Sequence, residues 1–202
     1  MKRFYFAVSF LGNDINETFL VGKCLKILHG FYYKQAIHDI GVSFPDWNNN
    51  SIGKRLVFVS INESSLKFLK VQKYFVDMVE LNYFLISNIG NCILDSKNSA
   101  VFNRNQKVDE LTVCAQKTKL RRLIKRAEKR GEIYQPKGRQ PSELIIPFHH
   151  EVPMSSRGNG NDFAIKIEKK DFRESNGNIF NSYGLSTNQT NINPVPIIFD
   201  EL

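Results

Sequence analysis

Aromatic residues and Val8 stand at alternate positions through Arg3–Phe10, as expected of a strand with one buried face. Apolar residues then recur every three or four positions through Leu20–Phe31, which is the period of an amphipathic helix. Two runs rich in β-branched and aromatic residues follow at His38–Phe44 and Arg55–Ile61, joined by a turn-forming segment. The first part of the chain therefore predicts a strand, a helix and two further strands.

A second helix is predicted over Glu63–Lys73 and a strand over Leu81–Ile86, which completes the order βαββαβ. This order is the split βαβ of the ferredoxin-like fold, an α+β class with both helices on one face of an antiparallel sheet. The predicted domain occupies residues 1–95, and the polar segment Asn88–Asn98 marks its boundary.

Residues 96–202 are expected to form a smaller, irregular α+β domain. It begins with a short strand near Val101 and contains a helix over about 117–130, for which Gly131 supplies the C′ residue. Four strand-like pieces complete it, at Leu144–Phe148, Phe163–Ile167, Ile179–Tyr183 and Val195–Phe199.

The charge is concentrated in the helix of this second domain. The chain carries 28 Lys and Arg against 20 Asp and Glu, a net charge of +8, and residues 117–130 alone contain eight basic residues and one acid, Glu128. A solvated helical face intersperses acids with bases, which fits poorly here, so a polyanionic partner is predicted. On a helical projection the cations cover half the circumference, and an apolar stripe on which the helix would dock holds Leu120, Leu123, Ile124 and Ala127.

Several classes of function are disfavoured. No apolar run approaches the roughly 18 residues that cross a bilayer, and the opening segment lacks a signal-peptide cleavage site, so we expect a cytoplasmic protein with no membrane partner. The three cysteines show no metal-ligand spacing, and His149 and His150 point to opposite faces of a strand. We therefore expect neither a metal nor a cofactor.

Individual residues allow two interpretations at this stage. His29 lies about 180° from Leu20 around its helix and is either a surface residue or a proton-transfer group. Phe163 shares a strand face with Ile165 and Ile167, which favours the core, and Tyr183 next to Gly184 is by default a packed tyrosine.

Several short segments, taken together, resemble the type I-F CRISPR precursor-RNA endoribonuclease family. They match in order and approximate spacing: Leu28-His29, Ile40–Pro45, Arg104-Asn105-Gln106 before an Arg-rich helix, Ser156 seven residues before Phe163, and Tyr183–Ser186. The chain is more closely similar to variants from transposon-borne CRISPR systems, at Ile27–Phe31, Phe180–Ser186 and Pro194–Pro196.

The resemblance implies a metal-independent cut at the 3′ base of a repeat hairpin, by attack of a 2′-hydroxyl that leaves a 2′,3′-cyclic phosphate. His29 would transfer a proton as base or acid, Ser156 would hold the 2′-hydroxyl, and Tyr183 would orient the imidazole or the nucleotide. Ser155 is adjacent to Ser156 and remains the alternative for that role.

The resemblance also implies a set of RNA contacts. Arg104 and Gln106 would read bases at the foot of the stem, and Phe163 would stack on the last base pair. The helix departs from the family pattern at Leu123 and Ala127. Its remaining cations would contact phosphates in the groove of the stem: Lys119, Arg121, Arg122, Lys125, Arg126, Lys129 and Arg130.

The expected partners are the repeat hairpin, retained as the 3′ handle of the crRNA, and the backbone subunits of a type I-F effector (Cascade) complex. In a transposon-borne system a transposition adaptor protein would join them, and the sequence does not separate that context from antiviral defence. Two alternatives stay open: a noncatalytic subunit that binds the RNA hairpin, and a DNA-binding protein that uses the basic helix in a major groove.

Overall fold

A computed structural model of the chain describes residues 2–106, 108, 113–135, 147–156, 160–174, 177–187 and 192–199. The chain forms two compact units. Unit 1 combines Met1–Arg104 with Phe148–Leu202, and unit 2 is the intervening Asn105–Pro147. This division differs from the domain boundary expected near residue 95, because the strands beyond that point join the same compact unit as the N-terminal sheet.

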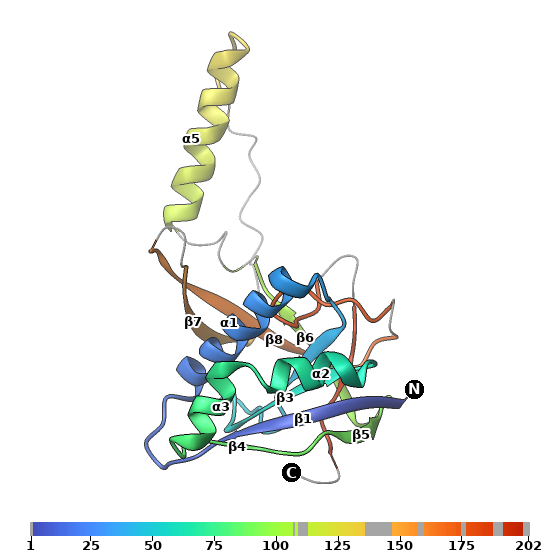
Figure 1. Cartoon of the computed structure of the whole chain (residues 1–202). Coiled ribbons are helices and arrows are strands. Elements are labelled where there is room, and N and C mark those ends of the chain that lie inside the picture. Colours follow the sequence, from blue (N-terminus) through green and yellow to red (C-terminus); the bar gives the residue numbers. More distant parts are fainter. Residues whose placement is uncertain are drawn as a thin grey trace. The chain divides into compact units, whose positions relative to one another are not determined.

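The first sheet of unit 1 confirms the predicted α+β class and the βαββαβ order. Its strands follow the order β2-β3-β1-β4, and every neighbouring pair is antiparallel, as in a ferredoxin-like sheet. Figure 1 shows α2 and α3 lying over one face of this sheet. The elements are β1 (Lys2–Phe10), α1 (Glu17–Gln35), β2 (Ile40–Ser43), β3 (Arg55–Ser60), α2 (Glu63–Lys70), α3 (Lys73–Glu80) and β4 (Phe84–Ile86).

Three details of this sheet were not predicted. The second helix is split, because Gln72 has an extended backbone that ends α2 and starts α3. The last strand begins only at Phe84, because Asn82 takes a left-handed turn conformation with φ of 56°. The segment expected to be a boundary contains an additional strand, β5 (Gly90–Ile93), which pairs with Lys2–Tyr5 of β1.

The second sheet has the order β7-β8-β6-β9, and its paired strands are antiparallel. It confirms the strand near Val101 and the strand over Phe163–Ile167. The strand predicted at Ile179–Tyr183 is wrong, because that segment is a loop, and the strand expected at Val195–Phe199 ends at Pro196. Of the piece predicted at Leu144–Phe148, residues 144–146 lie outside the described residues. The elements are β6 (Ser99–Arg104), β7 (His150–Ser155), β8 (Asp162–Asp171) and β9 (Val195–Pro196).

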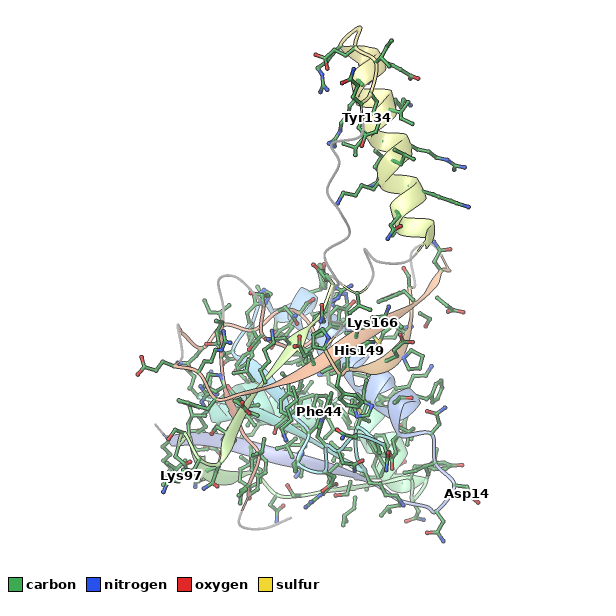
Figure 2. All side chains as sticks on the ribbon, turned by 180° about the vertical axis from the view of Figure 1, so that it is seen from behind. Asp14, Phe44, Lys97, Tyr134, His149 and Lys166 are labelled. Atoms are coloured by element: carbon green, nitrogen blue, oxygen red, sulfur yellow. The ribbon has the colours of Figure 1, made fainter. Side chains whose placement is uncertain are left out.

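The two sheets of unit 1 share one hydrophobic core. Phe102 of the second sheet packs against both Phe44 and Trp47, at ring-centroid distances of 5.0 and 5.6 Å, and Figure 2 shows Phe44 in the interior. Helix α1 also packs closely against β7 at Gly22, where a Cβ atom would lie 2.3 Å from the Pro153 carbonyl oxygen. Side chains from α1 and from the second sheet are therefore held in one body.

Arg3 fastens the first strand to the C-terminal segment. Its side chain is buried, and its guanidinium donates hydrogen bonds to the Pro194 carbonyl oxygen at 2.9 Å and to Asn178 Oδ1 at 3.0 Å. Burial lowers the pKa of this guanidinium. A buried cation is costly unless it is hydrogen-bonded, so these two acceptors are needed for β1 to occupy its place.

Unit 2 contains the predicted basic helix, α5 (Val113–Lys129). It ends as expected at Gly131, which has φ of 71°, while the Glu132 N–H donates to the Ala127 carbonyl oxygen at 3.0 Å. All seven candidate RNA-contacting cations are exposed, and Arg130 forms an ion pair with Glu132 at 3.0 Å. Of the four residues in the predicted apolar stripe, only Ala127 is buried.

Among the described helices, none combines the length and the apolar character that crossing a membrane requires.

Candidate active site

One groove of unit 1, with a volume of about 900 Å³, collects the predicted catalytic residues. Figure 1 shows α1, which carries His29, beside β7 and β8. The end of β7 contributes Ser155 and the following Ser156, β8 contributes Phe163, and the loop after β8 contributes Tyr183. Residues separated by more than 150 positions in the sequence thus line the same groove.

His29 and Tyr183 are in direct contact. Their rings stack with centroids 4.6 Å apart and an interplanar angle of 6°, and Tyr33 meets the imidazole edge-on at 4.8 Å. The Nδ1 atom of His29 is buried and has no hydrogen-bond partner among the described residues. Burial lowers the pKa of this histidine, so the neutral ring, which can accept a proton, is favoured at neutral pH.

The loop that carries Tyr183 is held by hydrogen bonds at several points. The side-chain oxygen of Asn181 accepts from the backbone N–H of Tyr183 at 2.9 Å and of Leu185 at 3.1 Å, which closes a tight turn. The Gly184 carbonyl oxygen accepts from the Val42 N–H at 2.9 Å, so the turn is docked on β2. These bonds explain why this segment is a turn and not the predicted strand.

Gly184 is expected to be intolerant of any side chain. It has φ of 73°, and a Cβ atom there would lie 2.8 Å from both Leu28 Cδ2 and Val42 Cγ1. We expect Gly184→Ala to lower the free energy of unfolding by about 2–4 kcal/mol, as the sum of left-handed strain and overpacking. Urea denaturation followed by circular dichroism measures this change.

The matched control is Gly30→Ala in α1, where an added Cβ meets nothing within 4 Å. Alanine should there raise the free energy of unfolding by about 0.5–1 kcal/mol through helix propensity. Equal effects of the two substitutions would contradict the assigned role of Gly184.

Lys26 is a groove residue that the sequence analysis missed. Its ammonium donates a hydrogen bond to Ser155 Oγ at 2.8 Å, and it precedes His29 by three residues, so both lie on neighbouring parts of the same helical face. Ser156 also lines the groove, and its N–H donates to the Asn161 carbonyl oxygen at 3.0 Å. The three-residue spacing between Lys26 and His29 was the sequence feature that could have identified Lys26 as a groove residue.

The base-reading candidates fall in different units. Arg104 ends β6 in unit 1, and its guanidinium carbon lies 5.8 Å from the centroid of the Tyr183 ring. Burial raises the pKa of Tyr183, whereas the positive charge of Arg104 acts in the opposite direction. Gln106 is exposed and belongs to unit 2.

Phe163 lies at the exposed end of its strand. Its side chain is 37% exposed, whereas Ile165 and Ile167 on the same face are fully buried. The core interpretation therefore holds for the two isoleucines and not for Phe163. An exposed aromatic ring at a groove is available for stacking.

No cluster of metal-ligating side chains occurs among the described residues. His150 is buried against Trp47, with ring centroids 4.4 Å apart, and its Nε2 lies 2.8 Å from the Asn48 carbonyl oxygen. His149 lies 3.8 Å from Glu151.

Comparison with known families identifies the chain. A family model described as CRISPR-associated protein (Cas_Csy4) matches residues 5–196. The chain belongs to the Cas_Csy4 family. The match includes both sheets, α1 and α5, and therefore every candidate residue described above. It confirms the type I-F resemblance, whereas the closer similarity to transposon-borne variants stays a prediction.

Solved structures similar to this Cas_Csy4 chain are distant. A crystal structure of CRISPR RNA processing endoribonuclease Cas6b shares 14% identity over 96% of this chain and 100% of its own, with a TM-score of 0.33. A second Cas6b crystal structure shares 12% identity with the same coverage of both chains, and its TM-score is 0.32. A putative chlorite dismutase gives 13% identity, coverage of 84% and 79%, and a TM-score of 0.28. No curated protein matches the chain.

Proposed function

We propose that this chain is a CRISPR RNA processing endoribonuclease that cleaves precursor RNA at the 3′ base of the repeat hairpin. Membership of the Cas_Csy4 family supports the general activity. The observation that carries the catalytic assignment is the His29 imidazole, stacked on Tyr183 in a groove that Ser155, Ser156 and Phe163 also line.

The proposed reaction uses the RNA's own nucleophile. The 2′-hydroxyl oxygen of the nucleotide before the cut bonds to the adjacent phosphorus, and the bond from phosphorus to the 5′ oxygen of the next nucleotide breaks. The products are a 2′,3′-cyclic phosphate and a 5′-hydroxyl, so a proton must leave the 2′ oxygen and another must reach the 5′ oxygen. A neutral imidazole such as His29 can take the first, and the imidazolium can supply the second.

The other groove residues fix the geometry of this reaction. A serine hydroxyl, that of Ser156 or of Ser155, would hydrogen-bond the 2′-hydroxyl, and Lys26 lies within a hydrogen bond of Ser155. Tyr183 covers one face of the imidazole, so the ring has little freedom to rotate. None of these roles requires a metal ion or a cofactor.

The RNA stem is proposed to bind through unit 2 and the rim of the groove. The exposed cations of α5 would neutralise phosphates, Arg104 and Gln106 would contact bases, and Phe163 would stack on the terminal pair. Because cleavage releases only the flanking strand, these contacts persist in the product. Retention of the crRNA 3′ handle, and its delivery to effector subunits, follow from that persistence.

A substrate lacking one hydroxyl tests the mechanism. Repeat RNA from the array encoded with this chain should be cleaved in EDTA, and the same RNA with a 2′-deoxynucleotide before the cut should bind equally well and stay intact. Binding of both RNAs without cleavage would instead indicate a noncatalytic hairpin-binding subunit. Preference for duplex DNA in a competition assay would indicate the DNA-binding alternative.

A further inference from the structure

A second hollow, with a volume of about 570 Å³, extends the candidate active site toward the start of α1. It shares its lining with the first groove at Phe19, Lys23, Lys26, Ser155 and Phe163, so the two are continuous. None of the catalytic steps above uses Phe19 or Lys23. Both side chains lie within three turns of His29 on the helix that carries it.

Phe19 and Lys23 form a platform of the kind that binds single-stranded nucleic acid. Phe19 is 46% exposed, and the Lys23 ammonium lies 4.8 Å from the centroid of its ring. Lys26 adds a second cation between this platform and the candidate catalytic centre. Aromatic rings stack bases regardless of sequence, while neighbouring cations hold the sugar-phosphate backbone.

The second hollow is lined by acidic side chains on its sheet side and by basic side chains on its helix side. Glu151 and Asp162 line it from β7 and β8, whereas Lys23 and Lys26 line it from α1. Carboxylates repel phosphates, so a strand in the hollow would keep its backbone on the α1 side. A cavity of this size accommodates a ligand comparable to a drug molecule, which corresponds to one or two nucleotides and excludes a helical stem.

We infer that Phe19, Lys23 and Lys26 form a subsite for the single-stranded RNA immediately downstream of the cut. This assignment rests on the proposed function, because it takes the scissile phosphate to lie beside His29. The stem ends at that phosphate, so the only single strand that adjoins it is the downstream flank. The subsite would hold the flank in line during cleavage and release it as the 5′-hydroxyl product.

Two uncleavable RNAs test the subsite. Both carry a 2′-deoxynucleotide before the cut; one ends at that nucleotide, and the other continues with a few uridines. The extension should tighten binding to the wild-type protein by about 5- to 150-fold, the range for one stacked base. Phe19→Ala should abolish this gain and leave the affinity for the unextended RNA unchanged, while Phe19→Leu, which keeps the bulk without the aromatic face, should also lose it.

The contribution of charge at the subsite is measured by the salt dependence of RNA binding. Lys23→Ala should reduce the slope of log affinity against log salt by about 0.7 for the extended RNA alone, the value for one phosphate of a single strand. Lys97→Ala is the matched control, because Lys97 is exposed and lies at the far side of unit 1 from Asp14, which precedes α1 (Figure 2).

The outcomes separate this inference from the proposed function. An extension that adds no affinity, or a Phe19→Ala variant that weakens both RNAs equally, would overturn the subsite while the endoribonuclease assignment stands. If Lys34→Ala, at the other end of α1, reduced the salt slope for the extended RNA and Lys23→Ala did not, that result would also overturn the subsite. Failure of the wild-type protein to bind the unextended hairpin would remove the proposed function, and the subsite with it.

Discussion

Replacing His29 by alanine is expected to slow the cleavage of repeat RNA by about 10²- to 10⁴-fold, the usual contribution of a general acid or base. The affinity for the RNA should stay close to that of the wild type, because the ring is engaged by Tyr183 and Tyr33 and adds no fixed charge. Single-turnover cleavage and filter binding measure the two quantities separately. His149→Ala, which removes a histidine outside the groove, should cleave at nearly the wild-type rate.

The pH dependence of the same reaction identifies the histidine and its role. Because burial lowers the pKa of His29, the inflection in kcat/KM should lie below the ordinary value of about 6.5. A rate that rises with pH through this inflection marks His29 as the base, since the neutral ring is then the active form. A falling rate marks it as the acid. An inflection at or above 6.5, or one that survives His29→Ala, would contradict the assignment.

Removing three cations from the centre of the basic face of α5 is expected to weaken binding of the hairpin by about 10²- to 10³-fold. The variant Arg122→Ala/Lys125→Ala/Lys129→Ala deletes three exposed charges and keeps the helix, because alanine is the best helix former. The slope of log affinity against log salt should fall by about 2 to 3, close to one for each lost phosphate contact. Titrations of labelled hairpin at several salt concentrations measure both changes.

A charge-matched control decides whether the effect is local. Lys2→Ala/Lys54→Ala/Lys97→Ala removes the same number of exposed cations from unit 1. If net charge alone attracted the RNA, both triple variants would lose the same salt dependence. The proposed contact predicts that only the α5 variant does, and that its cleavage rate at saturating protein stays near that of the wild type.

The fold could be predicted where periodicity is long and local. The alternate aromatic positions in β1 and the three- to four-residue period of α1 are carried by the residues themselves, and both elements occur where expected. The single buried face predicted for β1 is wrong, because Tyr5–Val8 are all buried and both faces of the strand are covered. Elements that local periodicity did not predict are of two kinds. Strand β5 depends on its pairing with β1, which is distant in the sequence. The extended backbone of Gln72 interrupts a segment that is otherwise helical.

The residues of the candidate site could be predicted from the sequence, whereas the contacts between them could not. Periodicity alone left His29 as an outward-facing histidine, and only the resemblance singled it out. The stack on Tyr183 depends on a loop whose turn is set by Asn181 and docked on β2, which no local pattern reveals. Lys26 was missed because its partner, Ser155, lies 129 positions away.

The buried guanidinium of Arg3 has a consequence for how the protein is made. Its two acceptors, on Asn178 and Pro194, follow it by 175 and 191 positions, so the first strand emerges from the ribosome long before its charge can be satisfied. While translation continues, the nascent chain has either to leave this strand unpaired or to hold a cation in an unfinished core. Satisfaction of this charge is thereby coupled to synthesis of the segment that carries both acceptors, and a chain that stops before Asn178 is expected to be a target for proteolysis.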